Sequence, residues 1–156
     1  MAGRIDARLK ELGIVLPEPP PPRFSYIPFV VTGRLVFISG QVPFQGAELM
    51  FKGKVPTDLD VPTAQKAARL VGLNILAHLK TACHGDLDLV TRCVKLGGFV
   101  NCAEGFGEQP QVINGASDLM VEVFGDIGRH ARFAVGAIAL PLNVAVEIDA
   151  VFELAA

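Results

Sequence analysis

The feature that most constrains the fold of this chain is a strict alternation of residue types near its C-terminal end. The even-numbered positions of the segment hold only apolar residues, Val144, Val146, Ile148, Ala150 and Phe152. The odd-numbered positions hold Ala145, Glu147, Asp149, Val151 and Glu153. A period of two is typical of a strand with one face against a core. We therefore predict a strand over residues 144–154, paired as a hairpin with a strand over 132–140 across a turn at Pro141-Leu142.

The preceding chain carries helix and strand patterns in a definite order. Apolar residues recur every three to four positions over 61–84 and 110–124, which predicts two amphipathic helices. Residues 89–101 are rich in Val, Leu and Phe and are predicted to form a strand. Upstream, two strands over 27–31 and 35–38 are predicted to form a hairpin at Thr32-Gly33. The stretch between Pro43 and Asp60 is predicted as a loop with one short strand near 48–51.

This order of elements favours an α+β fold in which one mixed sheet carries both helices on one face. No further core helix remains to cover the other face. Apolar types make up 51% of the residues and the mean hydropathy is +0.43, which is high for a small monomer. We therefore expect several copies to associate through their sheets.

The N-terminal segment 1–22 differs from the domain predicted over 23–156. Apolar residues at helical spacing predict a helix over 3–12, and Gly13 and the proline run from Pro17 to Pro22 then impose an extended path. We expect this arm to lie outside the core. It could be a spacer, close over a cleft, or embrace a neighbouring subunit.

Charge and cysteine content exclude several classes of protein. Lys and Arg number 14 against 16 Asp and Glu, so no basic excess is available for nucleic acid. The three cysteines lack metal or disulfide spacing, which favours a reduced, cytoplasmic environment. The longest apolar stretch, 133–152, is interrupted by Pro141 and by charged residues, so no membrane span is expected. No metal or organic cofactor is predicted.

Two charged residues of the C-terminal strands are candidates for chemistry. The guanidinium of Arg132 matches the two oxygens of a carboxylate, although a charged residue at a sheet edge needs no such role. Glu147 lies in an otherwise apolar strand, where an outward orientation or bonding to backbone explains it more simply than catalysis. In the predicted hairpin the two are about four residues, or ~13 Å, apart. A small ligand rather than a salt bridge could occupy that gap.

Other candidates are weaker when they are taken singly. Ser39-Gly40 ends a strand, where a glycine lets backbone groups approach a ligand, or is merely a turn. Tyr26, the only tyrosine, could pack or supply a phenol, and packing is favoured. Asn114 lies in the first turns of a helix, where an amide is often a surface residue. The three histidines lack metal spacing, and a histidine-driven mechanism is not predicted.

Taken together, three stretches resemble the YjgF/Rid family of reactive intermediate deaminases, also called L-PSP endoribonuclease-like proteins, in a longer subgroup. They are Val36-Phe37-Ile38-Ser39-Gly40-Gln41-Val42-Pro43, Arg132-Phe133-Ala134-Val135 with Leu140-Pro141, and Val146-Glu147-Ile148-Asp149-Ala150. The resemblance covers about Tyr26 to Leu154. It implies a chorismate-mutase-like fold and a homotrimer with a ligand cleft at each subunit interface.

The resemblance also implies a reaction, the hydrolysis of 2-imino or enamino acids to 2-keto acids and ammonia. By position, Arg132 is the carboxylate clamp, Glu147 positions water, and Tyr26, Ser39, Gly40 and Asn114 contact the substrate. Ala134 stands where the best-known enzymes have a cysteine, which bears on the identity of the substrate. The alternative is a non-catalytic trimer that binds a small carboxylate and acts as a sensor or a stabilising partner, and an endoribonuclease is a distant third.

Overall fold

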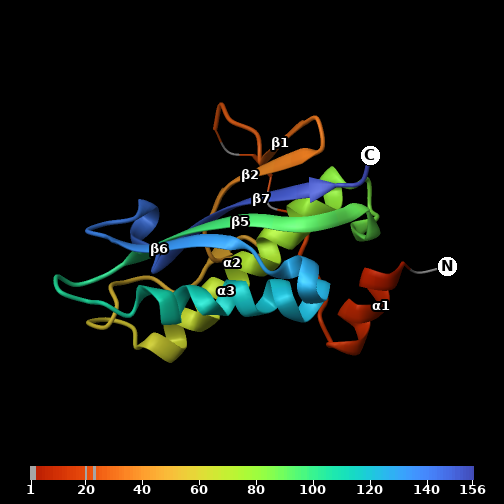
Figure 1. Ribbon diagram of the computed structural model, residues 1–156. Helices are drawn as coiled ribbons and strands as arrows, with labels where there is room; N and C mark the ends of the chain where they lie inside the picture. The colour runs from red at the N-terminus through yellow and green to blue at the C-terminus, as the bar shows by residue number, and fades with distance from the viewer. Residues whose placement is uncertain (1–2, 20, 23) are drawn as a thin grey trace.

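The computed structural model describes residues 3–19, 21–22 and 24–156, so Met1, Ala2 and Pro20 of the predicted arm, like Arg23, lie outside the described residues. The molecule has two main layers, a twisted sheet and a pair of long helices beneath it (Figure 1). Within the described residues no helix is long and apolar enough to cross a membrane.

The elements follow the predicted order, with small additions. The α-helices are α1 (Arg4–Glu11), α2 (Val61–Ala82) and α3 (Gln109–Phe124), and short 3₁₀ turns are η1 (Leu87–Leu89), η2 (Gly125–Gly128) and η3 (Pro141–Asn143). The strands are β1 (Phe29–Thr32), β2 (Leu35–Gln41), β3 (Phe44–Gln45), β4 (Glu48–Leu49), β5 (Val90–Asn101), β6 (Ala131–Ala137) and β7 (Val146–Leu154). The predicted short strand near 48–51 corresponds to β4, which pairs with β3 in a separate small hairpin.

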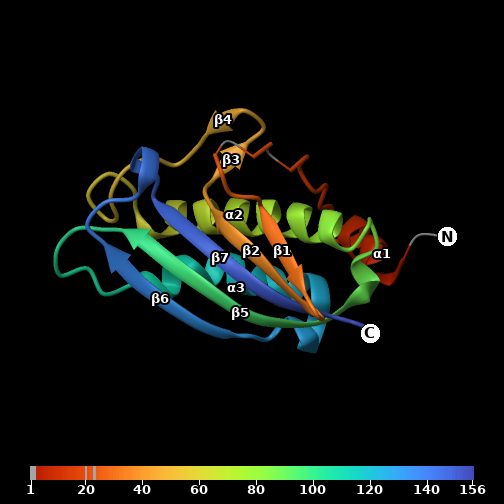
Figure 2. The same cartoon turned by 90° about the horizontal axis from the view of Figure 1, so that it is seen from above.

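The main sheet is mixed and has the strand order β1-β2-β7-β5-β6. Strands β5 and β6 are parallel, and the other pairs are antiparallel. The N-terminal hairpin is confirmed, with Thr32 opposite Leu35 across the turn. Figure 2 shows α2 and α3 side by side behind the sheet, which confirms the mixed sheet with both helices on one face.

The predicted C-terminal hairpin is wrong, although both of its strands exist. Strand β5 lies between β6 and β7 and pairs with each of them. The connection through η3 therefore crosses the end of β5 instead of turning back beside β6. The Asn101 amide at that end donates to the Asn143 side chain at 3.3 Å and to the Val144 carbonyl at 3.1 Å. These bonds attach the crossover to β5, and pairing at this range is not visible in local sequence.

The two long helices bury the apolar stripes that their spacing predicts. The Asp60 carboxylate accepts a hydrogen bond from the Thr63 amide at 2.8 Å and so caps the start of α2. Helices α2 and α3 pack closely, because a Cβ added at Gly115 would lie only 2.1 Å from the Gln65 carbonyl oxygen. This packing fixes the position of α3 relative to β5 and β6, the elements that carry Arg132 and its neighbours.

Helix α1 is part of the core, contrary to the expectation for the N-terminal arm. Ile5 and Leu9 are buried in the main hydrophobic cluster. The Asp88 carboxylate accepts hydrogen bonds from the Arg4 and Ile5 amides at 2.7 and 2.8 Å, which caps the helix. The burial of two large apolar side chains explains why this short helix docks.

The sheet face away from the helices is open in the single chain. Large apolar side chains lie exposed on it, namely Val30, Phe37, Phe99 and Val135. Charged side chains of β5 and β7 lie among them, including Lys95, Glu147 and Asp149. The predicted apolar character of this face is therefore present in the single chain.

Candidate functional site

Arg132 and Glu147 lie on opposite faces of the sheet. Arg132 pairs in register with Leu96 on the helix side, whereas Glu147 pairs with Phe99 on the open side. Phe99 in turn pairs with Val135, three residues beyond Arg132. Two strand spacings and three residue rises place the two Cα atoms about 14 Å apart. Within one chain, the two side chains therefore belong to separate half-sites.

The first half-site surrounds the Arg132 guanidinium between β6 and α3. Its Nη1 donates to the Asn114 side-chain oxygen at 2.7 Å and to the Ser117 hydroxyl oxygen at 3.1 Å. Helix α3 therefore holds one nitrogen of the guanidinium. Among the described residues, Nη2 and Nε make no hydrogen bond, so two donors remain available to a carboxylate. The structure thus brings Asn114 and Arg132 together.

His130 extends this half-site and was not among the predicted site residues. Its Nδ1 lies 2.7 Å from the Gly128 carbonyl oxygen, so Nδ1 carries the proton. Its Nε2 then accepts a hydrogen bond from the Ser117 hydroxyl, with Nε2 and Oγ 2.9 Å apart. The Ser117 oxygen is left free to accept from Arg132. Burial above all, and Arg132 to a smaller degree, lower the pKa of His130, while the Gly128 bond opposes this. A neutral ring suits this arrangement.

The second half-site surrounds the Glu147 carboxylate at an irregularity in β2. The pairing of β2 with β7 shifts register between Ile38 and Gln41, and Gly40 lies in this bulge. A Cβ at Gly40 would lie 2.6 Å from Glu147 Oε1, so only glycine leaves room for the carboxylate where it stands. Burial, with a smaller contribution from Asp149, raises the pKa of Glu147.

Tyr26, Gly40 and Glu147 line one pocket of about 540 Å³. The other lining residues are Pro21, Pro22, Phe24, Pro28, Gln41, Val42, Phe44, His78, Pro141 and Leu142. The Ser39 hydroxyl does not line the pocket, because it donates to the Ile27 carbonyl at 2.7 Å and holds the segment that carries Tyr26. His78, on α2, is the lining residue that sequence reasoning set aside.

Ala134 lies next to the first half-site, on the same face of β6 as Arg132, and packs partly against the core. The thiol of Cys102 is two positions further along this row, since a Cβ at Gly136 would lie 2.7 Å from its sulfur. Among the residues that the structure describes, no three His, Cys, Asp or Glu side chains are grouped where they could hold a metal ion.

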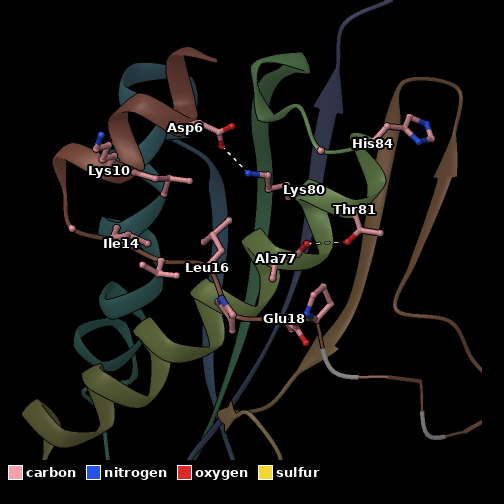
Figure 3. A pocket seen from close by; sticks show the side chains of 15 residues that line it. Asp6, Lys10, Ile14, Leu16, Glu18, Ala77, Lys80, Thr81 and His84 are labelled. Carbon is pink, nitrogen blue, oxygen red and sulfur yellow. Dashed lines mark hydrogen bonds and ion pairs between the residues drawn. The ribbon is translucent and has the colours of Figure 1, made fainter. Parts of the chain in front are cut away.

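A larger cavity of about 910 Å³ lies away from both half-sites, between the N-terminal arm and α2. One ion pair at this cavity joins α1 to α2, with Lys80 Nζ 2.8 Å from Asp6 Oδ1 (Figure 3). The Thr81 hydroxyl donates to the Ala77 carbonyl of its own helix. Neither Arg132 nor Glu147 lines this cavity.

Comparison with known proteins agrees with this architecture. The family model described as "YjgF/chorismate mutase-like, putative endoribonuclease" matches residues 6–154. The chain belongs to the YjgF family. This YjgF-family chain is 44% identical over 154 residues to Protein TCP17 of Trypanosoma cruzi, covering 98% of the chain and 96% of that protein.

Two crystal structures are also close to this YjgF-family protein. Atu1372 of Agrobacterium tumefaciens, a protein of unknown function, has 48% identity and a TM-score of 0.89, covering 97% of this chain and 94% of its own. A "putative endoribonuclease" of Shewanella oneidensis MR-1 has 34% identity and a TM-score of 0.92, covering 96% of this chain and 99% of its own. This coverage leaves room for few unmatched residues, so most of the N-terminal arm is matched in these two structures.

Proposed function

We propose that this protein hydrolyses 2-imino acids and their enamine tautomers to 2-keto acids and ammonia, and that it does so as a homotrimer. The observation that carries the proposal is the division of the candidate residues into two complementary halves. One half presents an unoccupied pair of guanidinium donors on Arg132, and the other presents a carboxylate of raised pKa in a pocket. The pair matches the two ends of a small imino acid.

The chemistry follows from these two groups. Two N–H donors of Arg132 bind the substrate carboxylate and orient the imine. Glu147 accepts a proton from water as the water oxygen bonds to the imine carbon. The imine nitrogen takes this proton back, which gives the carbinolamine. Glu147 then accepts the proton of the carbinolamine hydroxyl and passes it to the nitrogen, so that the C–N bond breaks and ammonia leaves as the carbonyl forms. One water is consumed, and the keto acid keeps the original carboxylate.

A second copy of the chain is needed to complete the site. The Cα atoms of Arg132 and Glu147 are about 14 Å apart, and their side chains leave opposite faces of the sheet. Within one chain the two side chains are therefore too far apart to act on one small substrate. Arg132 lies on β6, an edge strand, and Glu147 on the open face. A neighbour whose edge strand approaches that face would bring the halves together and cover the exposed Phe37 and Phe99.

The test is a coupled assay. An L-amino-acid oxidase generates short-lived imines, and their loss is followed by competition with semicarbazide. Wild-type protein is expected to accelerate imine loss, and Arg132→Ala is expected to abolish this while the mass of the oligomer, measured by light scattering, is unchanged. Full activity in Arg132→Ala would refute the carboxylate clamp. Keto-acid binding by wild-type protein without accelerated imine loss would instead establish the binding-only alternative.

RNA cleavage is the rival activity, because the family description and one relative carry the name endoribonuclease. The net charge of −2 gives little attraction for phosphates, and both ring nitrogens of His130 are engaged. We therefore expect no cleavage of a labelled single-stranded RNA by the preparation that hydrolyses imines. RNA cleavage by the wild-type protein that is lost in Glu147→Gln would favour the nuclease.

A further inference from the structure

The pocket beside Glu147 extends well beyond the space that water and an imine carbon need. Its volume of about 540 Å³ lies in the range of about 300–1,000 Å³ typical of sites for drug-sized ligands. Glu147 reaches it from the open face of the sheet, whereas His78 reaches it from α2 on the helix side. The pocket therefore passes beside the β2 bulge, from the water-positioning carboxylate toward the helix layer.

The walls of this pocket suit a flat apolar group. Phe24 and Tyr26 stack with ring centroids 6.1 Å apart and an interplanar angle of 19°. Pro21, Pro28 and Phe44 contribute further flat or rigid surfaces. Prolines and aromatic rings present little side-chain entropy to lose, and aromatic rings pack well against aromatic ligands. A substrate side chain that enters from Glu147 meets these surfaces first.

His78 is the one polar group that α2 contributes to this pocket. The residue is only 2% exposed, and its ring makes no hydrogen bond to any described residue. Among the described residues, every side-chain nitrogen or oxygen that is fully buried has a hydrogen-bond partner. Because the ring nitrogens of His78 have no partner, they are not fully buried, and they must face the open space of the pocket that His78 lines.

An unpaired imidazole in this position needs an explanation. A buried polar group without a partner costs free energy, and an apolar residue at position 78 would avoid that cost. Burial lowers the pKa of His78, so the ring is neutral near pH 7 and offers one donor and one acceptor. A ligand group that both donates and accepts, such as a phenol, would satisfy it.

We propose that this pocket is the side-chain subsite of the enzyme and that it selects 2-imino acids whose aromatic side chain ends in a hydrogen-bonding group, received by His78. The inference rests on the proposed deaminase reaction, because Glu147 marks where the imine carbon lies. His78 is here a specificity-determining residue. It contacts the far end of the substrate and takes no part in the hydrolysis.

The experiment compares imines made from tyrosine, phenylalanine and alanine, with wild type, His78→Leu and His78→Gln. Wild type is expected to favour both aromatic imines over the alanine imine, and the tyrosine imine most. In His78→Leu, kcat/KM for the tyrosine imine should fall by about 2- to 13-fold, the value of one net hydrogen bond. The phenylalanine and alanine imines should change by less than about twofold. His78→Gln, which keeps a donor and an acceptor, should recover part of the loss.

The exposed His84 supplies the matched control. Its backbone has a φ of 53°, so His84→Asn is the suitable substitution, because asparagine tolerates that conformation. It should leave all three rates unchanged. Equal losses on all three substrates in His78→Leu would reveal a merely structural role and overturn the proposal, as would no loss on any of them.

A binding experiment distinguishes a failure of this inference from a failure of the proposed function. Calorimetry with 4-hydroxyphenylpyruvate, phenylpyruvate and pyruvate requires no turnover. If imine hydrolysis fails but wild type binds the hydroxyphenyl keto acid most tightly and His78→Leu removes that preference, the subsite stands and the deaminase proposal falls. If wild type binds the three keto acids equally, the subsite is overturned, whether or not imines are hydrolysed.

Discussion

Replacing Gly40 by alanine tests the second half-site with the smallest possible change. The added Cβ would lie 2.6 Å from Glu147 Oε1, whereas ordinary contact begins at about 3.4 Å. The carboxylate oxygen must therefore move by about 0.8 Å, the difference between these distances. The backbone at Gly40 does not have a positive φ, so alanine itself brings no conformational strain.

A displacement of this size is enough to harm catalysis. A general base that is misplaced by about 1 Å can cost on the order of 100-fold in rate, so we expect kcat for imine hydrolysis to fall by about 10- to 100-fold. Stability should change by less than about 1 kcal/mol, because the group that moves is the end of a flexible side chain and alanine lowers the entropy of the unfolded chain. The coupled imine assay and thermal unfolding measure the two effects separately.

Gly107→Ala is the matched control. A Cβ at Gly107 would meet no atom within 4 Å, and its φ is not positive, so this variant should retain both activity and stability. If Gly40→Ala keeps wild-type kcat, the Glu147 carboxylate does not act from the position that the structure gives it. If Gly40→Ala loses activity only in proportion to a loss of folded protein, the steric reasoning fails as well.

Three further predictions address charge, positioning and the N-terminal helix. Asp149→Asn removes the smaller of the two causes that raise the pKa of Glu147. Because Glu147 must be ionised to act as a base, the acid limb of the kcat/KM profile should move to lower pH but stay above that of an ordinary glutamate. Asp118→Asn, at an exposed position, is the control and should leave the profile unchanged. Ser117→Ala removes one acceptor of Arg132 and should raise KM for imines by about 2- to 13-fold with little change in kcat, and an unchanged KM would contradict the positioning role. Asp88→Ala removes the cap of α1 and should cost about 1 kcal/mol, seen as a fall in melting temperature of about 2–4 °C, and no fall would mean that the cap is not stabilising.

The local sequence pattern predicted the helices and strands well, but it did not predict every pairing between strands. The stripe of α2 and the alternation of β7 are visible along the chain because periodicity is a local property. The insertion of β5 between β6 and β7 is a long-range choice, held by contacts such as Asn101 to Val144 that no short window contains. The wrong hairpin placed Arg132 and Glu147 on adjacent strands, and that error concealed their separation onto opposite faces.

The same limit explains what the sequence showed of the candidate site. Arg132 and Asn114 were predicted as members of one site through the family resemblance, and the structure gives the hydrogen bond between them. Ser117 and His130 were missed because each is an ordinary polar residue until folding brings it to Arg132. His78 was set aside because a helical histidine is usually structural, and only its lack of a partner in a lined pocket distinguishes it.

The anchoring of α1 by Asp88 has a consequence for how such proteins could change their substrates. This cap holds α1 to the body of the protein, and the chain that leaves α1 next enters β1, so the segment between them is held at both ends. Pro21, Pro22 and Phe24 of that segment form one wall of the pocket. A change of one residue in the length of the segment would therefore resize the pocket without altering Arg132 or Glu147.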